Sequence, residues 1–217
     1  MRDRVLVFDA AGTLIHPDPP VATVYATAAA RHGLVVSEDH LRLRFRRILR
    51  GVIGGRGNDQ THRAIWREIV AQVFERPAEQ LEPLFEELWD HFAQPSAWNV
   101  FPDVVEHWPR LLDSYQRVAI ASNFDSRLRQ ILIGHGLWID EATFWSSALG
   151  CAKPEGHFFK QIEHRLEVSP SDCLMVGDDP HHDYHAARKA AWSALLLDRQ
   201  ARFASDDLRA IRSCGDL

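Results

Sequence analysis

Asp9 stands directly after a short apolar run, Val5 to Phe8, whose β-branched residues predict a strand buried on both faces of a sheet. A carboxylate at the carboxyl end of such a strand lies where ligands gather in open α/β sheets. In the turn that follows, Gly12 permits close backbone approach and Thr13 offers a hydroxyl, so the turn can present amide donors to an anion. A buried strand that simply ends in a turn explains the same residues, so the chemistry depends on what the rest of the chain supplies.

A second apolar run, Val118 to Ala121, is followed by Ser122, Asn123 and the amphipathic stretch Leu128 to Ile133. A hydroxyl between a strand end and a helix N-terminus suits a phosphoryl oxygen, because the helix amides and the hydroxyl share its negative charge. Helix capping by the serine and the asparagine is the alternative interpretation.

Lys153 precedes Pro154 and a helix that we expect to begin near Glu155. A compact ammonium group at a helix entry can neutralise a carboxylate or a phosphate, although most single lysines are only solvated. Lys153 is therefore a candidate for charge compensation at the site that Asp9 and Ser122 indicate.

Three aspartates, Asp178, Asp179 and Asp183, lie within six residues, just after a strand predicted over Leu174 to Val176. Such carboxylates repel one another unless a cation compensates them, and their hard oxygen atoms suit Mg²⁺ together with phosphate and water. Acidic residues at a helix N-terminus account for one of these aspartates more easily than for three. The histidines beside them lack nearby cysteines, and we interpret them as solvated surface residues rather than as a zinc site. They are His181, His182 and His185.

Taken in order, Asp9, Ser122, Lys153 and Asp178 match the four motifs of the haloacid dehalogenase superfamily, which the chain resembles over nearly its whole length. The finer pattern is similar to the haloacid-dehalogenase-like hydrolase-domain-containing branch with a helical cap. It consists of Tyr25, His32, Gly33, Trp66, the segment from Trp89 to Trp98, and the run from Ser122 to Asp125 followed by Arg127 and Leu128.

The resemblance implies an α/β fold, with a Rossmann-like core on a parallel sheet and an inserted four-helix cap. Apolar spacing of three and four residues agrees with this, because it predicts helices over residues 20–32, 38–50, 61–74 and 78–92, with Pro77 and Pro95 as breakers. The expected division is a core of residues 1–16 and 97–200, a helical cap of residues 17–96, and a C-terminal helix or tail of residues 201–217.

The resemblance also implies that Asp9 attacks phosphorus and forms an aspartyl-phosphate, which water later hydrolyses with Mg²⁺ bridging enzyme and substrate. Ser122 would hold the phosphoryl group, and Lys153 would offset the crowded negative charge. The implied catalytic residues are Asp9, Ser122 and Lys153. The implied metal ligands are Asp9, the backbone carbonyl of Ala11, Asp178 and Asp183. The expected substrate contacts are Gly12, Thr13, Asn123 and Arg56, the last of which lies in a glycine-rich connection where a solvated arginine is an equal alternative.

Ala11 departs from most phosphatases of this superfamily, which carry an aspartate two residues after the nucleophile to protonate the leaving group and activate water. Losing a general acid and base removes about 10²–10⁴ in rate. The turn resembles that of phosphonoacetaldehyde hydrolases, but the expected cap contains no lysine for their Schiff base. Dehalogenation is disfavoured because Gly177 to Asp179 indicate a metal-binding loop. Whether a cap residue such as His62 replaces the missing acid stays open.

We therefore expect a Mg²⁺-dependent phosphatase that acts, with slow turnover, on a small phosphorylated molecule. The alternatives are a non-catalytic phosphate-binding or scaffold protein and a phosphonatase-type or dehalogenase-type hydrolase. A net charge of −5 and a pI near 6.2 provide no basic surface for nucleic acid. No apolar run approaches the roughly 20 residues that cross a bilayer, so we expect a cytoplasmic protein without membrane contact. The sequence does not indicate an oligomeric state.

Overall fold

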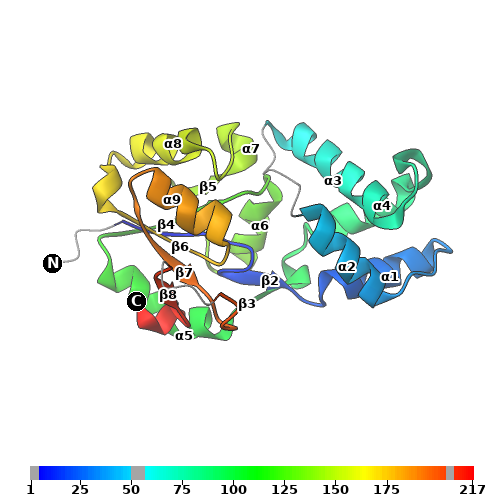
Figure 1. Ribbon diagram of the computed structural model, residues 1–217, viewed down its shortest axis with the longest axis horizontal. Helices are drawn as coiled ribbons and strands as arrows, with labels where there is room; N and C mark the ends of the chain where they lie inside the picture. The colour runs from blue at the N-terminus through cyan, green and yellow to red at the C-terminus, as the bar shows by residue number, and fades with distance from the viewer. Residues whose placement is uncertain (1–4, 50–56, 204–207) are drawn as a thin grey trace.

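A parallel β-sheet forms the centre of the larger part of the molecule (Figure 1). The computed structural model describes residues 5–49, 57–203 and 208–217, and six strands of these ranges form the sheet in the order β5-β4-β1-β6-β7-β8. The strands are β1 (Val5–Phe8), β4 (Arg117–Ser122), β5 (Thr143–Trp145), β6 (Cys173–Gly177), β7 (Ser193–Leu197) and β8 (Ala210–Ile211). Phe8 is in register with Ile120 and Val176, so the residues that follow β1, β4 and β6 meet at one edge of the sheet.

Helices cover both faces of this sheet, because successive side chains of a strand point to opposite faces. Leu6 and Phe8 belong to a buried cluster with residues of α5 and α6, whereas Val5 and Val7 belong to a second cluster with residues of α8 and α9. The helices are α5 (Pro102–Ser114), α6 (Arg127–Gly134), α7 (Ser146–Leu149), α8 (Gly156–Leu166) and α9 (Ala186–Lys189). The expected α/β fold with a parallel sheet is therefore confirmed.

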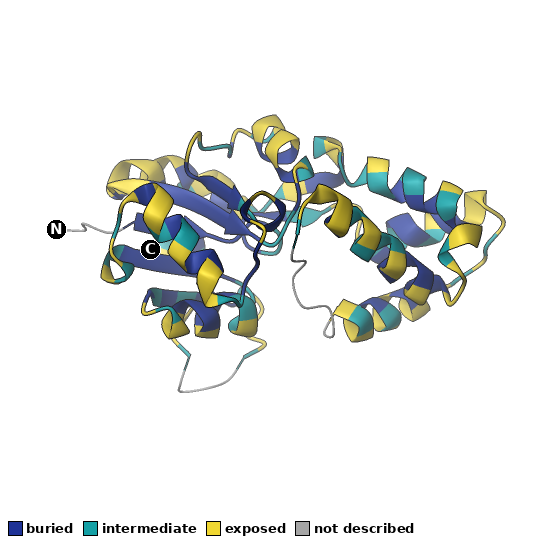
Figure 2. Ribbon diagram, turned by 90° about the horizontal axis from the view of Figure 1, so that it is seen from above, coloured by how far each residue is buried: buried dark blue, intermediate teal, exposed yellow. Residues whose placement is uncertain are grey.

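Four further helices form a separate lobe beside the sheet (Figures 1 and 2). They are α1 (Val21–Arg31), α2 (Glu38–Leu49), α3 (Asp59–Phe74) and α4 (Glu82–His91). The lobe has its own buried core, in which Tyr25 packs edge-on against Phe45 and stacks on Phe74. The chain leaves and re-enters the sheet-containing part through an antiparallel pair, β2 (Ile15–Pro17) and β3 (Trp98–Val100).

Two of the lobe helices differ from the predicted ranges for local reasons. The helix expected from residue 61 begins at Asp59, because the Asn58 side chain caps it by accepting a hydrogen bond from the Thr61 amide at 3.1 Å. The helix expected over 78–92 is divided into a 3₁₀ turn, Ala78–Gln80, and α4. Pro83 lies in the first turn of α4, where a proline is tolerated, but it cannot continue a preceding helix.

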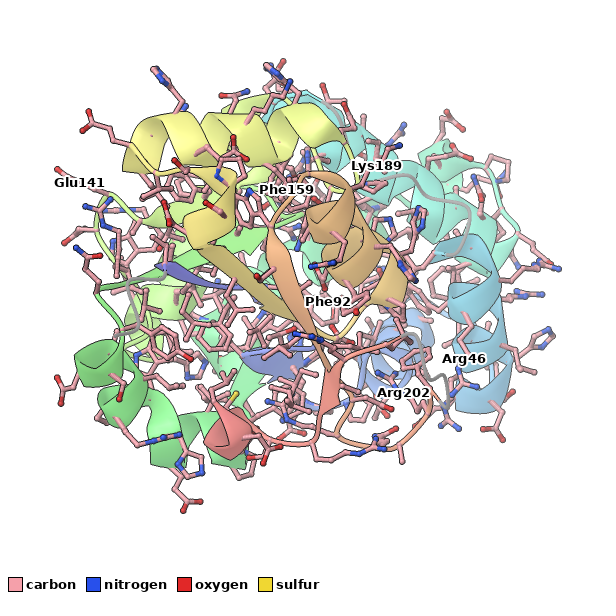
Figure 3. The ribbon with its side chains drawn as sticks, turned by 60° about the vertical axis from the view of Figure 1, so that its left-hand side comes forward. Arg46, Phe92, Glu141, Phe159, Lys189 and Arg202 are labelled. Carbon is pink, nitrogen blue, oxygen red and sulfur yellow. The ribbon has the colours of Figure 1, made fainter. Side chains whose placement is uncertain are left out.

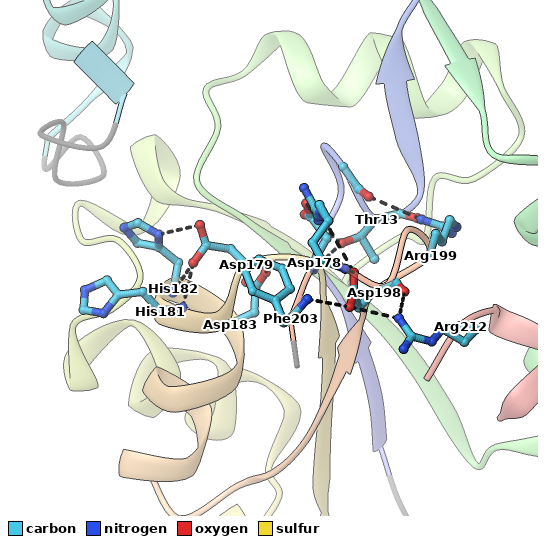
Figure 4. Close-up of polar contacts among 12 residues, drawn as sticks. Thr13, Asp178, Asp179, His181, His182, Asp183, Asp198, Arg199, Phe203 and Arg212 are labelled. Atoms are coloured by element: carbon cyan, nitrogen blue, oxygen red, sulfur yellow. Dashed lines mark hydrogen bonds and ion pairs between the residues drawn. The ribbon is translucent and has the colours of Figure 1, made fainter. Parts of the chain in front are cut away.

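The sequence predicted a C-terminal helix or tail over residues 201–217, and the described residues of this segment form no α-helix. The segment contributes β8 to the sheet and ends in a 3₁₀ turn, Cys214–Asp216. The buried Asp198 carboxylate holds its beginning by accepting hydrogen bonds from the backbone amides of Arg202 and Phe203 and from Arg212 (Figure 4). Leu217 is buried in the sheet core, so hydrophobic burial as well as hydrogen bonding fixes this segment.

Side chains sort by polarity between the core and the surface. Figure 3 shows Phe159 between α8 and the sheet, whereas Glu141 and Lys189 point to solvent. In the part of the chain that the structure describes, no helix combines the length and the apolar character needed to cross a membrane.

Candidate active site

Asp9 lies at the carboxyl end of β1 and is almost completely buried. Its backbone amide donates to the carbonyl of Val176 at 2.9 Å, which continues the pairing of β1 with β6. Its carboxylate oxygen Oδ1 accepts hydrogen bonds from Ser122 Oγ at 3.0 Å and from Lys153 Nζ at 2.7 Å. The parallel register thus brings together three residues that are far apart in the sequence.

The Lys153 ammonium group is buried and uses all three of its protons. It donates to Asp9 Oδ1, to Asp183 Oδ1 at 2.6 Å and to the carbonyl of Ala121 at 2.9 Å. Burial alone lowers a lysine pKa, but the two carboxylates outweigh it and hold the pKa of Lys153 above its ordinary value. Lys153 is therefore a permanent positive charge beside Asp9.

Asn123 positions Lys153 through the backbone. Its side chain donates to the Lys153 carbonyl at 2.8 Å and accepts from the Lys153 amide at 2.8 Å. The amide side chain of Asn123, which was expected to contact substrate, makes this paired contact between the segment after β4 and the segment before α8, and Asn123 also lines the cavity beside the Asp9 turn.

Asp9, Asp178 and Asp183 form a group of carboxylates with one oxygen of each within 4.8 Å of the others. Burial, and then the Asp9 carboxylate, raises the pKa of Asp178 to about 6. Burial also raises the pKa of Asp183, against the opposing effect of Lys153. When all three are ionised, the Lys153 ammonium group offsets one negative charge, and Arg202, whose Nη2 lies 3.7 Å from Asp178 Oδ2 at the half-exposed edge of the group, offsets part of another. Oxygen donors with this charge fit a divalent cation such as Mg²⁺.

Two glycines make this close approach of carboxylates possible. A Cβ at Gly12 would collide with the Asp178 carboxylate, and a Cβ at Gly177 would collide with the Asp183 carboxylate. Gly12 also has a φ of +96°, which other residues rarely adopt. Both positions therefore need glycine for steric reasons, and Gly12 shapes the site through its small size.

Thr13 orients the loop that carries Asp178. Its hydroxyl oxygen accepts a hydrogen bond from the Asp178 amide at 3.1 Å, and the side chain is completely buried. The hydroxyl was expected to contact substrate, but in the structure it is engaged with Asp178 (Figure 4).

Asp179 lies beside the carboxylate group and caps the turn that follows it. Its Oδ1 accepts from the amides of His181 at 2.7 Å and His182 at 2.8 Å (Figure 4). Burial raises the pKa of Asp179, but the hydrogen bonds with His181 and His182 outweigh burial, so the pKa lies well below its ordinary value. The helix-capping interpretation therefore fits Asp179, while Asp178 and Asp183 face Asp9.

Arg199 was missed by sequence reasoning, although it follows the end of β7 much as Asp9 follows β1. Its guanidinium group donates to the carbonyls of Gly12 at 3.3 Å and Thr13 at 2.9 Å. It also forms a two-point contact with Asp103, at 3.0 Å from each carboxylate oxygen, and lies over the Phe101 ring. Arg199 thereby fixes the turn after Asp9 to α5. Any residue type can supply a backbone carbonyl, so the sequence does not reveal such a contact. The position of Arg199 just after a strand was the one feature that could have identified it.

A cavity of about 330 Å³ lies between the lobe and the turn after Asp9. Ala11 and Gly12 line it on one side, and aromatic and aliphatic residues of α1, α3 and α4 line it on the other. His62 is not among the described residues that line this cavity. It is buried, with Nε2 at 3.3 Å from Ser146 Oγ, and so links α3 to α7. Arg56, expected to contact substrate, lies outside the described residues.

Comparison with known proteins identifies the family. Residues 4–191 match a family model for haloacid dehalogenase-like hydrolases. The chain is 30% identical over 204 residues to haloacid dehalogenase-like hydrolase domain-containing protein 3 of Bos taurus, covering 89% of this chain and 81% of that protein. The human protein of the same name is 29% identical over the same shares.

Solved structures share the fold. The magnesium-bound HAD-hydrolase YfnB of Bacillus subtilis aligns with a TM-score of 0.71 and 15% identity over 100% of this chain and 97% of that chain. A HAD phosphatase of Thermococcus onnurineus aligns with a TM-score of 0.65 and 21% identity over 97% and 94% of the two chains. The family match over most of the chain, together with the curated relatives, shows that this protein belongs to the haloacid dehalogenase-like hydrolases.

Proposed function

We propose that the protein is a Mg²⁺-dependent phosphatase that hydrolyses a small phosphate ester through an aspartyl-phosphate at Asp9. The observation that carries this proposal is the buried contact of Lys153 Nζ with both Asp9 and Asp183, next to the Asp178 carboxylate. A lysine held there allows one carboxylate to approach an anionic phosphoryl group. The structural neighbours include a HAD phosphatase and a magnesium-bound HAD-hydrolase, and also dehalogenases, so they support a hydrolase, while the carboxylate group supports the choice of a metal-dependent phosphatase.

In this proposal Asp9, Asp178, Asp183 and the Ala11 carbonyl would hold Mg²⁺, which supplies charge neutralisation for the phosphoryl oxygens. An Asp9 oxygen attacks phosphorus, the ester bond breaks, and the leaving group departs with its electron pair. The Ser122 hydroxyl, which in the structure donates a hydrogen bond to Asp9, would donate it to the phosphoryl group instead. Water then attacks phosphorus, which releases phosphate and restores Asp9.

We also propose that the α1–α4 lobe, residues 17–96, acts as a cap over a core of residues 1–16 and 97–200. The cavity between the lobe and the Asp9 turn supports this division. The His62–Ser146 contact and the hydrogen bond from the Ser126 amide to Asp59 at 3.1 Å hold the lobe against the core.

Phosphate release from a panel of esters, measured with Mg²⁺ and with a chelator, tests the reaction. We expect Mg²⁺-dependent turnover that Asp9→Asn abolishes, and a phosphoryl adduct on the peptide containing Asp9 when turnover is quenched. Asp179→Asn is the matched control, because asparagine also caps a helical turn. Turnover that is unchanged by chelator or by Asp9→Asn would refute the proposal.

A non-catalytic phosphate-binding protein is the second candidate, and Ala11 is the observation that favours it. In that case Mg²⁺ and phosphate would stabilise the fold together, while no ester would be hydrolysed.

A further inference from the structure

The cavity described above reaches the turn that follows Asp9. Ala11 and Gly12 line it, and Asp9 precedes Ala11 by two residues. A group attached to a phosphoryl unit at Asp9 would therefore extend into this cavity. Its volume of about 330 Å³ is at the lower end of the roughly 300–1,000 Å³ typical of ligand pockets.

The described walls of this cavity are mainly apolar and rich in aromatic rings. The lobe residues that matter here are Tyr25, Leu49, Trp66, Val70, Phe85 and Trp89. Such walls stabilise a ligand by removing apolar surface from water, and they penalise a charged ligand that must give up its hydration.

The described wall contains one oppositely charged pair, Arg127 and Asp125, whose side chains bind each other. Arg127 donates from Nε and Nη2 to the Asp125 carboxylate, at 2.8 and 2.7 Å, and from Nη1 to the Trp89 carbonyl at 3.3 Å. The guanidinium carbon lies 3.4 Å from the centre of the Trp89 ring. This cation is therefore occupied, and it offers little to a second anionic group on a substrate.

Ala11 favours a particular kind of leaving group for a chemical reason. Without a carboxyl group at this position, the leaving oxygen must depart with little help from protonation, which favours acidic alcohols such as phenols. An aspartate here would also place a charge on the cavity wall. The shape, the polarity and the missing acid thus agree on one substrate class.

We propose, on the basis of the phosphatase function above, that the substrate is an aryl phosphate monoester whose aryl group is apolar and carries no charged substituent. The phosphoryl unit binds at Asp9 and Lys153, and the aromatic ring fills the cavity between the turn and the lobe. The wall residues then determine specificity, because each buried methylene of the leaving group strengthens binding.

A series of esters with matched leaving-group acidity tests this. Phenyl, 4-ethylphenyl and 4-propylphenyl phosphate differ in apolar area, and O-phosphotyrosine adds charges to a similar phenol. We expect kcat/KM with Mg²⁺ to rise roughly fourfold per added methylene and to be lowest for O-phosphotyrosine. A flat series, or a preference for O-phosphotyrosine, would overturn the substrate class while leaving the phosphatase function intact.

Two variants on α2 locate the effect. Leu49 lines the cavity and is 43% exposed, whereas Leu43 is 66% exposed and is not among the described cavity residues. Leu49→Ala should reduce the advantage of the 4-propylphenyl ester over the phenyl ester, and Leu43→Ala should preserve it. Equal effects of the two variants would place the leaving group elsewhere.

Binding of 4-propylphenol separates this proposal from the phosphatase function. Trp66, Trp89 and Trp98 line the cavity, so the phenol should change intrinsic tryptophan fluorescence without any turnover. If no ester is hydrolysed, the phosphatase function fails. In that case, phenol binding that Leu49→Ala weakens still supports an aromatic site, and the absence of binding rejects it.

Discussion

The ammonium group of Lys153 donates a hydrogen bond of 2.7 Å to Oδ1 of Asp9, and both side chains are buried. This contact joins the segment before α8 to the end of β1. The nucleophile proposed here is therefore already paired with a cation before any substrate or metal ion binds.

Replacing Lys153 with methionine should impair both stability and activity. The change removes the positive charge but keeps an unbranched chain, so Asp9 and Asp183 are left buried without their ammonium partner. We expect the free energy of unfolding to fall by about 3–5 kcal/mol in the absence of Mg²⁺, measured by urea denaturation. Lys160→Met on the exposed face of α8 is the matched control and should change little. Equal stability of the two variants would show that the buried pair contributes nothing.

Mg²⁺ should raise the melting temperature, because an ion that binds only the folded state stabilises it by mass action. Asp178→Asn should abolish most of that rise, since it removes one of the three carboxylates that lie within 4.8 Å of one another. Asp179→Asn should retain the rise, because Asp179 caps the following turn instead. If wild type and Asp178→Asn shift equally, Asp178 is not a metal ligand.

The Mg²⁺ effect should also depend on pH. The pKa of Asp178 is raised to about 6, so below that value the folded protein binds a proton that the cation must displace. For the same reason, ionisation of Asp178 destabilises the metal-free fold as pH rises from about 4 through 6, and Mg²⁺ offsets this cost. We expect a larger rise in melting temperature at pH about 8 than at about 5. A rise that is independent of pH would contradict the raised pKa.

Arg199→Lys should reduce kcat more than it changes KM. Lysine keeps the charge but cannot bind Asp103 at two points while also reaching the carbonyls of Gly12 and Thr13. A small displacement of the turn after Asp9 then misaligns the reacting groups, and we expect a loss of at least about tenfold in kcat. Arg212→Lys is the control, because Arg212 contacts Asp198 rather than the turn. Loss of melting temperature without loss of kcat would limit Arg199 to a structural role.

The α/β fold was expected from the family resemblance, and three of the four segments of the site also obey a simple rule for parallel sheets, whereas Lys153 lies beyond α7 and not at a strand end. Polar residues at the carboxyl ends of neighbouring parallel strands must meet at one edge, and this holds for Ser122, which ends β4, and for Asp9 and Asp178, which follow β1 and β6. The helices of the lobe were predictable because apolar residues over 20–92 recur every three or four positions and do not alternate with polar ones as they would in strands.

Other features depended on contacts that a sequence does not reveal. Thr13 and Asn123 carry polar side chains at the expected places, but residue type does not show whether such a group faces a ligand or the protein. In the structure Thr13 binds the Asp178 amide, and Asn123 binds the Lys153 backbone while also lining the cavity. The C-terminal strand β8 is only two residues long, which is too short to produce an alternating pattern.

Ala11→Asp should make the enzyme less dependent on the acidity of the leaving group. In the wild type, esters of acidic alcohols such as 4-nitrophenol should react, while alkyl phosphates should lag because alanine cannot protonate the leaving oxygen. Ala11 lines the cavity, so an aspartate side chain has room there. We expect it to increase kcat/KM for alkyl esters by about tenfold or more, as measured by phosphate release across a series of leaving-group pKa values.

Ala11→Asn is the matched control for this experiment, because asparagine has nearly the same size as aspartate but cannot donate and recover a proton in the same way. It should leave the steep dependence of the wild type unchanged. If asparagine and aspartate act equally, the effect arises from packing at the cavity wall. Wild-type turnover that is insensitive to leaving-group pKa would instead mean that another residue supplies the acid, and the lobe residues facing Ala11 across the cavity would be the first to test.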